Sequence, residues 1–137
     1  MLNLNSPDFL ERHIVIVDDD VPSVKYYETV LKYTGAEITV LKNGKEFIEF
    51  IEAGAKRPDF VIMDFLVPFV NGIDCTRRFR RTDKTTPVVM ISAFYSEQTK
   101  NDAFVAGCNE YVLKPVLPEK LVMLLEKYLT HKRHLVL

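Results

Sequence analysis

The sequence predicts an α/β fold: a doubly wound parallel sheet of five strands with helices on both faces. Three observations support this prediction. Five short, β-branched apolar runs are separated by stretches with helical periodicity. Most of these runs are continuously apolar, which is typical of strands buried on both faces. Strict alternation of strand and helix within 137 residues favours parallel strands joined by right-handed crossovers.

The five predicted strands are each three to five residues long, which is short enough for a compact doubly wound domain. One of them alternates apolar and polar residues, as an edge strand with one wet face does. The predicted strands are Ile14 to Val17, Glu37 to Leu41 (the alternating one), Phe60 to Met63, Val88 to Ile91 and Tyr111 to Leu113.

Capping and breaking residues mark the first two helices. We expect Asp20 to begin the first helix and Gly35 to stop the chain after it. Asn43 can cap the second helix and Gly54 can end it, by the same logic.

The remaining helices follow the third, fourth and fifth strands. A third helix is predicted from about Gly72 to Arg81, and a fourth from Ser96, as its cap, to Ala106. The fifth begins at Pro118, where a proline in the first turn has no intrahelical N–H bond to lose. The basic run Arg77, Arg78, Arg80 and Arg81 is interpreted as a solvated face of the third helix rather than as a docking patch.

The composition is that of an ordinary soluble globular protein, with 47% hydrophobic and 27% charged residues. The net charge of −1 gives no field that would attract nucleic acid or an anionic membrane. No apolar run approaches the roughly 20 residues that span a bilayer. The first eleven residues lack the basic start and apolar stretch of a secretory signal, so we expect a cytoplasmic protein. Cys75 and Cys108 have no framework spacing and are expected to be free, partly buried thiols.

Polar residues stand where four of the predicted strands end. The first strand ends in Asp18-Asp19-Asp20, the third in Asp64, the fourth in Ser92, and the fifth in Lys114-Pro115. In an open parallel sheet the ligand site lies beyond the carboxyl ends of the strands. We therefore expect these groups to meet at one rim.

The acids of this rim need a counterion. Two carboxylates ~4 Å apart repel by ~4 kcal/mol at an effective dielectric of ~20. A cation among them would remove that cost. Oxygen ligands without a nearby His or Cys cluster favour a hard ion, Mg²⁺ first.

A carboxylate can itself be a nucleophile and form an aspartyl phosphate. Phosphoryl transfer asks mainly for positioning and charge neutralisation, which a metal, an ammonium and a hydroxyl can provide. Asp64 is the best nucleophile candidate, because its strand is central and faces both the acidic pair and Lys114.

Four motifs together resemble the response-regulator receiver domain of two-component signalling, of the chemotaxis-regulator type. They are Val17-Asp18-Asp19-Asp20, Asp64-Phe65-Leu66-Val67-Pro68 with Asn71-Gly72, Ile91-Ser92-Ala93, and Tyr111-Val112-Leu113-Lys114-Pro115. The resemblance runs from about His13 to Leu129. It implies a flavodoxin-like sheet of order 2-1-3-4-5 with five helices. It also divides the chain into an N-terminal extension (1–12), a receiver domain (13–129) and a C-terminal tail (130–137).

The resemblance implies a role for each rim residue. Asp64 is the expected phosphoacceptor, taking the group from a phosphohistidine on a sensor histidine kinase or phosphotransfer protein. Asp19, Asp64 and the main-chain carbonyl of Leu66 are expected to bind Mg²⁺, with Mn²⁺ as a substitute, and Asp18 helps through an ordered water. Lys114 pairs with the phosphate, and its peptide bond to Pro115 is expected to be cis.

The resemblance also implies a signalling route. Ser92 bonds a phosphate oxygen after transfer, which frees Tyr111 to turn inward and alters the face of helix four, strand five and helix five. The expected partners are the phosphodonor and a downstream protein target, with a homodimer on phosphorylation and no direct contact with nucleic acid or membrane. The domain is not an enzyme beyond its own phosphorylation and dephosphorylation.

Two apolar residues occupy positions from which a polar side chain could orient an attacking water. Leu66 lies two residues after the acceptor, and Phe94 two residues after the hydroxyl. Neither side chain can hydrogen-bond an attacking water. We therefore expect slow hydrolysis of the phosphorylated form.

Two other functions compete with this interpretation. Asp18-x-Asp20 after an apolar strand also resembles haloacid dehalogenase-type phosphatases, but Pro22 stands where that family needs a hydroxyl or similar group, and a cap is lacking. A receiver-like module that is never phosphorylated is the other alternative, and the intact acids and Lys114 argue against it. A stand-alone regulator and a receiver cut from a larger protein fit the sequence equally well.

Overall fold

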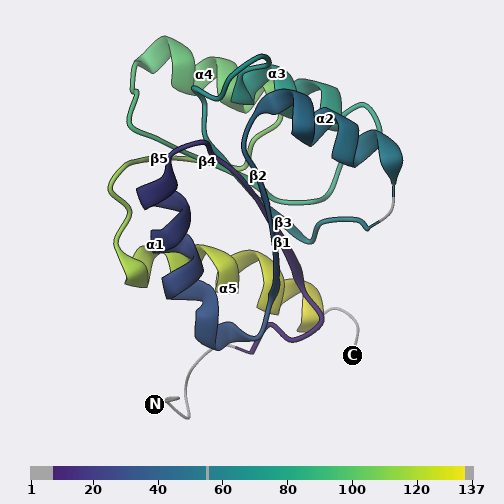
Figure 1. The fold of residues 1–137 in the computed structure, drawn as a ribbon, viewed down its shortest axis with the longest axis vertical. Coiled ribbons are helices and arrows are strands. Elements are labelled where there is room, and N and C mark those ends of the chain that lie inside the picture. Colours follow the sequence, from purple (N-terminus) through teal and green to yellow (C-terminus); the bar gives the residue numbers. More distant parts are fainter. Residues whose placement is uncertain (1–7, 55, 135–137) are drawn as a thin grey trace.

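The protein forms one five-stranded parallel sheet of order β2-β1-β3-β4-β5 (Figure 1), which confirms the predicted fold. The structure is a computed structural model that describes residues 8–54 and 56–134, with side chains up to residue 129. The strands are β1 (His13–Val17), β2 (Glu37–Leu41), β3 (Phe60–Met63), β4 (Val88–Ser92) and β5 (Glu110–Leu113).

The helices begin at the predicted caps. Asp20, Asn43 and Ser96 each accept a hydrogen bond from the backbone N–H three residues on, as N-caps do. Gly35 and Gly54 adopt the left-handed conformation that stops the chain. The helices are α1 (Val21–Leu31, continued by a 3-10 turn at Lys32–Thr34), α2 (Gly44–Ala53), α3 (Gly72–Phe79), α4 (Glu97–Ala106) and α5 (Pro118–His134). Within the described ranges, no helix combines the length and apolarity that crossing a membrane would take.

Helices cover both faces of the sheet, with α1 and α5 on one side and α2, α3 and α4 on the other (Figure 1). Successive residues of β1 therefore enter different cores. Ile14 and Ile16 pack towards α1 and α5, whereas Val15 and Val17 pack towards the other three helices. This double burial explains why the central strands are continuously apolar.

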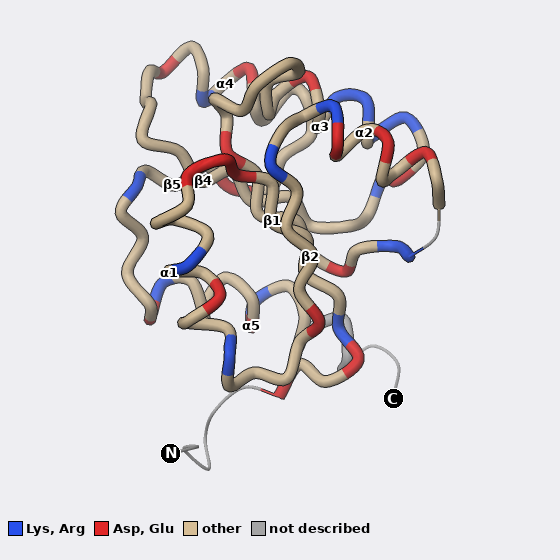
Figure 2. Tube along the Cα trace, in the orientation of Figure 1, with Lys and Arg blue, Asp and Glu red and all other residues tan. Residues whose placement is uncertain are grey.

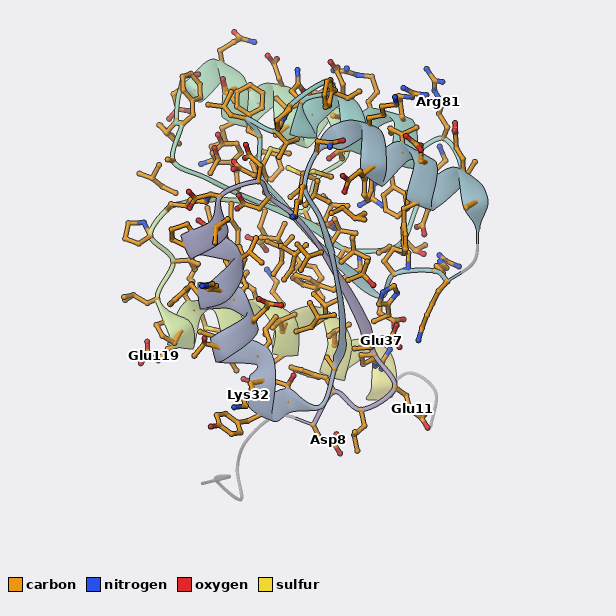
Figure 3. The ribbon with its side chains drawn as sticks, viewed as in Figure 1. Asp8, Glu11, Lys32, Glu37, Arg81 and Glu119 are labelled. Atoms are coloured by element: carbon orange, nitrogen blue, oxygen red, sulfur yellow. The ribbon has the colours of Figure 1, made fainter. Side chains whose placement is uncertain are left out.

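The helix that carries the basic run is shorter than predicted. It ends at Phe79, and Arg80 is its C-cap. The Arg80 guanidinium donates to the carbonyl of Gly107 (2.9 Å) and to Asn109 Oδ1 (3.1 Å), so it ties the end of α3 to the α4–β5 loop. The prediction of a solvated face was wrong for Arg80, and it holds for Arg81, which extends outward (Figure 3).

The two cysteines are free, as expected, but they are more deeply buried than predicted. Cys75 and Cys108 belong to the core between the sheet and helices α2, α3 and α4. Burial raises the thiol pKa to about 12 for Cys75 and to about 11 for Cys108. Neither thiol is a thiolate at neutral pH, so both are packing groups.

Asp83 organises the loop between α3 and β4. Its carboxylate accepts hydrogen bonds from the backbone N–H groups of Thr85 and Thr86, from Thr86 Oγ1 and from Arg57 Nε. Burial alone would raise the pKa of Asp83, but the hydrogen bonds from Thr86, Thr85 and Arg57 outweigh it and hold the pKa below its ordinary value. The ionised carboxylate therefore stabilises the folded state.

We expect Asp83→Asn to destabilise the fold by about 2 kcal/mol at pH 7, because an amide cannot accept all four bonds and leaves a buried donor unpaired. A depressed folded pKa gives stability that is present above the ordinary value of 3.8 and is lost as the pH falls through the folded pKa. The difference from wild type should therefore shrink below about pH 4. Urea unfolding at both pH values measures it, with the exposed Asp102→Asn as the control. Equal stability of Asp83→Asn and wild type at pH 7 would contradict the assignment.

Candidate functional site

Three aspartates follow β1 at the carboxyl edge of the sheet, and Figure 2 shows them as one red segment leading into α1. The backbone N–H of Asp18 bonds Leu41 O (3.0 Å), which fixes the chain beside the end of β2. Asp18 Oδ1 accepts from the backbone N–H of Asp20 (2.9 Å). The Asp20 side chain itself is occupied in capping α1 through Ser23, so it does not face the acidic group.

Asp64 follows β3, the strand next to β1. Its backbone N–H bonds Val17 O (2.9 Å), and its side chain is largely buried, with 7% of the residue exposed. The loop after Asp64 returns closely past it, because Gly72 N–H bonds Phe65 O (2.8 Å). A Cβ on Gly72 would lie 2.3 Å from the Asp64 carbonyl oxygen, so only glycine allows this approach.

The structure brings three carboxylates together. Asp18, Asp19 and Asp64 each offer an oxygen, and these oxygens lie within 4.8 Å of one another. Asp18 is buried and Asp19 is exposed, so the group opens to solvent on the Asp19 side. A set of oxygen donors at this spacing suits a hard divalent cation.

Lys114, from the end of β5, lies beside these acids. Its ammonium is 3.0 Å from Asp18 Oδ2 and 3.4 Å from Asp64 Oδ2. Burial by itself would lower the pKa of Lys114, but the hydrogen bond with Asp18 and the charges of Asp64 and Asp18 raise the pKa above its ordinary value. Lys114 is therefore a fixed positive charge at neutral pH.

The pKa of Asp18 is raised, whereas the pKa of a carboxylate in a simple ion pair with a lysine would be lowered. Burial raises the pKa of Asp18, and the nearby charge of Asp64 adds to this, against the lowering effect of the bonds from Asp20 and Lys114. The pKa values of both Asp18 and Lys114 thus rise. For Lys114 the two acids outweigh burial, while for Asp18 burial and a second carboxylate outweigh one ammonium. One lysine does not fully neutralise the group, and a cation would complete the neutralisation.

Ser92 and Tyr111 lie on β4 and β5 next to Lys114. The carbonyl of Ser92 accepts from the Lys114 backbone N–H (2.8 Å), and Ser92 Oγ accepts from the backbone N–H of Phe94 (3.2 Å). Tyr111 is half-buried, and its hydroxyl donates to the Phe94 carbonyl (2.5 Å). Ser92 and Tyr111 thus hold the same short loop from two sides. The Lys114–Pro115 peptide bond is cis.

Leu66 and Phe94 both lie on loops at the carboxyl edge. Both side chains are exposed, and the Phe94 ring packs against Phe65, with ring centroids 5.6 Å apart. They place apolar surface on the two loops that follow Asp64 and Ser92.

Sequence reasoning missed two features of the site. It did not foresee the contact between the Lys114 ammonium and Asp18 (3.0 Å), and the predicted pairing of Lys114 with a phosphate stays a prediction. It also missed a cavity of about 430 Å³ between α1 and the β5–α5 loop, lined partly by Tyr26 and Val116. The Tyr26 hydroxyl donates to the Val116 carbonyl (2.5 Å), a contact between positions 90 residues apart that no local pattern signals.

Comparison with known proteins is consistent with this geometry. Residues 14–126 match the family model of the response regulator receiver domain. The chain is 33% identical over 110 residues to YkoG of Bacillus subtilis, an uncharacterised transcriptional regulatory protein, covering 80% of this chain and 47% of that protein. The chain spans about half the length of the curated relatives it matches, YkoG at 47% and the response regulator SaeR of Staphylococcus aureus at 52%.

Solved receiver domains share the fold. A CheY-like receiver domain protein from Methanospirillum hungatei superimposes with a TM-score of 0.83 at 21% identity, covering 90% of this chain and 97% of that one. The receiver domain of the sensor histidine kinase PA1611 from Pseudomonas aeruginosa, solved with a magnesium ion in its active site cleft, gives 0.76 at 24% identity, covering 85% and 96%. The family model match, the five-stranded order and the acid–lysine rim agree: this chain belongs to the response regulator receiver domain family.

Proposed function

We propose that Asp64 accepts a phosphoryl group from a phosphohistidine on a sensor histidine kinase or phosphotransfer protein, in a reaction that depends on Mg²⁺. One observation carries the proposal. The Asp64 carboxylate lies within a group of three acids and 3.4 Å from a lysine ammonium, at the carboxyl edge of the sheet. This arrangement offers a nucleophile together with fixed positive charge for the incoming phosphoryl oxygens.

In the transfer, an oxygen of Asp64 bonds to phosphorus while the P–N bond of the phosphohistidine breaks, and the imidazole nitrogen keeps the electron pair. Lys114 is placed to hold one equatorial oxygen by a charge-assisted hydrogen bond. Ser92 would donate its hydroxyl proton to another. The chain therefore contributes positioning and charge rather than acid–base chemistry.

The oxygens of Asp18, Asp19 and Asp64, within 4.8 Å of one another, support a divalent cation site. In our proposal Asp19, Asp64 and the Leu66 carbonyl would hold the ion. When bound, Mg²⁺ would neutralise the acids and the phosphoryl oxygens. Asp18 has both oxygens engaged, by the Asp20 N–H and by Lys114, which favours contact through a water. Mn²⁺ accepts the same oxygen ligands and is expected to substitute.

The β4–α4 loop would transmit the effect of phosphorylation from Asp64 to the surface of the domain. A new bond from Ser92 to the phosphate would compete with its bond to the Phe94 N–H, and the loop that Tyr111 holds would shift. Tyr111, whose ring packs against the core and whose hydroxyl bonds Phe94 O, would follow this shift and change the face formed by α4, β5 and α5. A downstream protein target, or a second copy of the domain, would recognise that face. Residues 13–129 are the proposed receiver unit.

The phosphatase alternative is not favoured. It needs Asp18 as the nucleophile, yet Asp18 is the most buried of the three acids and both of its oxygens accept hydrogen bonds. Among the described residues, by comparison, only Oδ2 of Asp64 accepts a hydrogen bond, from Lys114.

Incubation with acetyl phosphate, followed by intact mass spectrometry, tests the proposal. We expect one phosphoryl adduct per chain in the presence of Mg²⁺ and loss of the adduct when EDTA is added beforehand. An adduct that forms equally well in EDTA, or no adduct in Mg²⁺, would overturn the proposal.

We predict that the phosphorylated form is long-lived. Leu66 and Phe94 are both exposed and apolar, so neither can orient an attacking water beside the phosphate. Once the donor is removed, the adduct should decay over minutes to hours, and Phe94→Gln together with Leu66→Asn should shorten its life by at least about tenfold. Loss of the wild-type adduct within seconds would contradict this.

A further inference from the structure

We propose that Phe69 is a docking residue for the protein phosphodonor, which it contacts as part of an apolar rim around Asp64. The inference rests on the proposed function, since it names a contact made by the donor. The apolar rim consists of four exposed side chains at the carboxyl edge: Val21, the first residue of α1, Leu66 and Phe69 in the loop after β3, and Phe94 in the loop after β4.

Phe69 is unusual in its backbone. Its φ of 72° lies in the left-handed region, which a bulky aromatic residue rarely adopts. The backbone N–H of Val70 bonds Pro68 O (2.9 Å) across it, and Gly44 N–H bonds the same carbonyl (3.1 Å). The loop is therefore held tightly on both sides of a strained residue, which is a pattern of functional positions.

Phe69 is also unusual in its exposure. The residue is 81% exposed, and its ring makes no aromatic contact with any other described residue. Its neighbour Val70 packs on the core, so the turn sends one apolar side chain inward and the other into solvent. Folding alone does not explain a strained, exposed Phe, because Asn or Gly would relieve the strain without loss of packing.

The other members of the rim are exposed too, with Leu66 at 58%, Val21 at 60% and Phe94 at 42%. They lie at the first residue of α1 and on the loops that follow β3 and β4, at the carboxyl edge of the sheet where Asp64 lies. A protein donor must bring its phosphohistidine to Asp64, which is only 7% exposed, so its surface must cover these loops. Exposed apolar side chains at the same edge as a recessed polar centre would exclude water from a docked complex and favour an apolar partner surface.

A small donor has no such surface. Phosphoramidate carries the same P–N bond as phosphohistidine, and it would reach Asp64 without touching Phe69. The inference therefore predicts that Phe69 affects transfer from a protein donor and leaves transfer from phosphoramidate unchanged.

The test uses Phe69→Asn in the full chain. Asn adopts the left-handed region more readily than Phe, so the variant should be at least as stable as wild type. The probe is the purified, ATP-phosphorylated histidine kinase that transfers fastest to the wild-type chain among those of the source organism. We expect kcat/KM for this transfer to fall by at least about tenfold, mainly through KM, with an unchanged phosphoramidate rate. Phe69→Leu should recover part of the loss.

Val105→Asn is the matched control, because Val105 is exposed and apolar but lies near the end of α4 distant from the β4–α4 loop. Three results would overturn the inference. The first is an unchanged kinase rate in Phe69→Asn, which would assign the exposed ring to another partner. The second is an equal fall with both donors, which would make Phe69 a support of the site itself. The third is an equal fall in Val105→Asn. Failure of phosphoramidate with the wild-type chain would instead overturn the proposed function.

Discussion

Asp64→Asn should reduce phosphoryl incorporation from acetyl phosphate by at least about a hundredfold. The amide keeps the shape of the side chain but is no longer a nucleophilic carboxylate. The substitution also removes one of three acids that repel one another, so the variant should unfold at the same temperature as wild type or higher. Intact mass spectrometry over time measures the incorporation, and thermal unfolding confirms that the variant is folded.

Asp20→Asn is the matched control for this change. It removes one negative charge from the same acidic run, but Asp20 only caps α1 through Ser23, and Asn is an equally good N-cap. We expect incorporation within about twofold of wild type. Equal losses in the two variants would mean that the net charge of the rim, rather than the Asp64 carboxylate, drives the reaction.

Gly72→Ala should be strongly destabilising, because it adds a methyl group directly beside Asp64. The added Cβ would lie 2.3 Å from the Asp64 carbonyl oxygen and 2.9 Å from Met63 Cγ, and the first of these is backbone that cannot rotate away. The strand end must shift, at a cost of about 3 kcal/mol in the free energy of unfolding. Because the shift displaces Asp64, phosphoryl incorporation should fall by at least about tenfold as well. Urea unfolding and the incorporation rate measure the two effects.

Gly54→Ala separates this crowding from the general cost of replacing a glycine. Gly54 has a φ of 65°, and a Cβ there would meet nothing within 4 Å. The expected cost is about 1 kcal/mol, from the left-handed backbone alone, with no change in incorporation. Equal unfolding energies and unchanged incorporation in the two variants would contradict the close approach of Gly72 to Asp64.

The layout of the rim could be predicted because its causes are local. Runs such as Phe60–Met63 are typical of doubly buried strands, and caps such as Asn43 mark where helices start. Alternation of strand and helix makes the strands parallel and brings their carboxyl ends to one edge. The strand order that makes the strands before Asp18 and Asp64 neighbours was implied by the resemblance to receiver domains, and the structure has it.

What could not be predicted depends on contacts between distant parts of the chain. Arg80 looked like its basic neighbours, but the end of α3 at Phe79 turns it towards the α4–β5 loop. The contact between Lys114 and Asp18 joins positions 96 residues apart, so only the folded geometry shows it. Phe69 carried no signal at all, because neither exposure nor a positive φ can be read from a single aromatic residue in a loop.

The most direct test of the central claim is to locate the phosphoryl group. An aspartyl phosphate is a mixed anhydride, and borohydride reduces it to homoserine, a stable mark that peptide mass spectrometry can place. After treatment with acetyl phosphate and Mg²⁺, the mark should appear at position 64 and be absent when EDTA is present. A mark at Asp18 or Asp19, or a mark at Asp64 that forms without a divalent cation, would contradict the account.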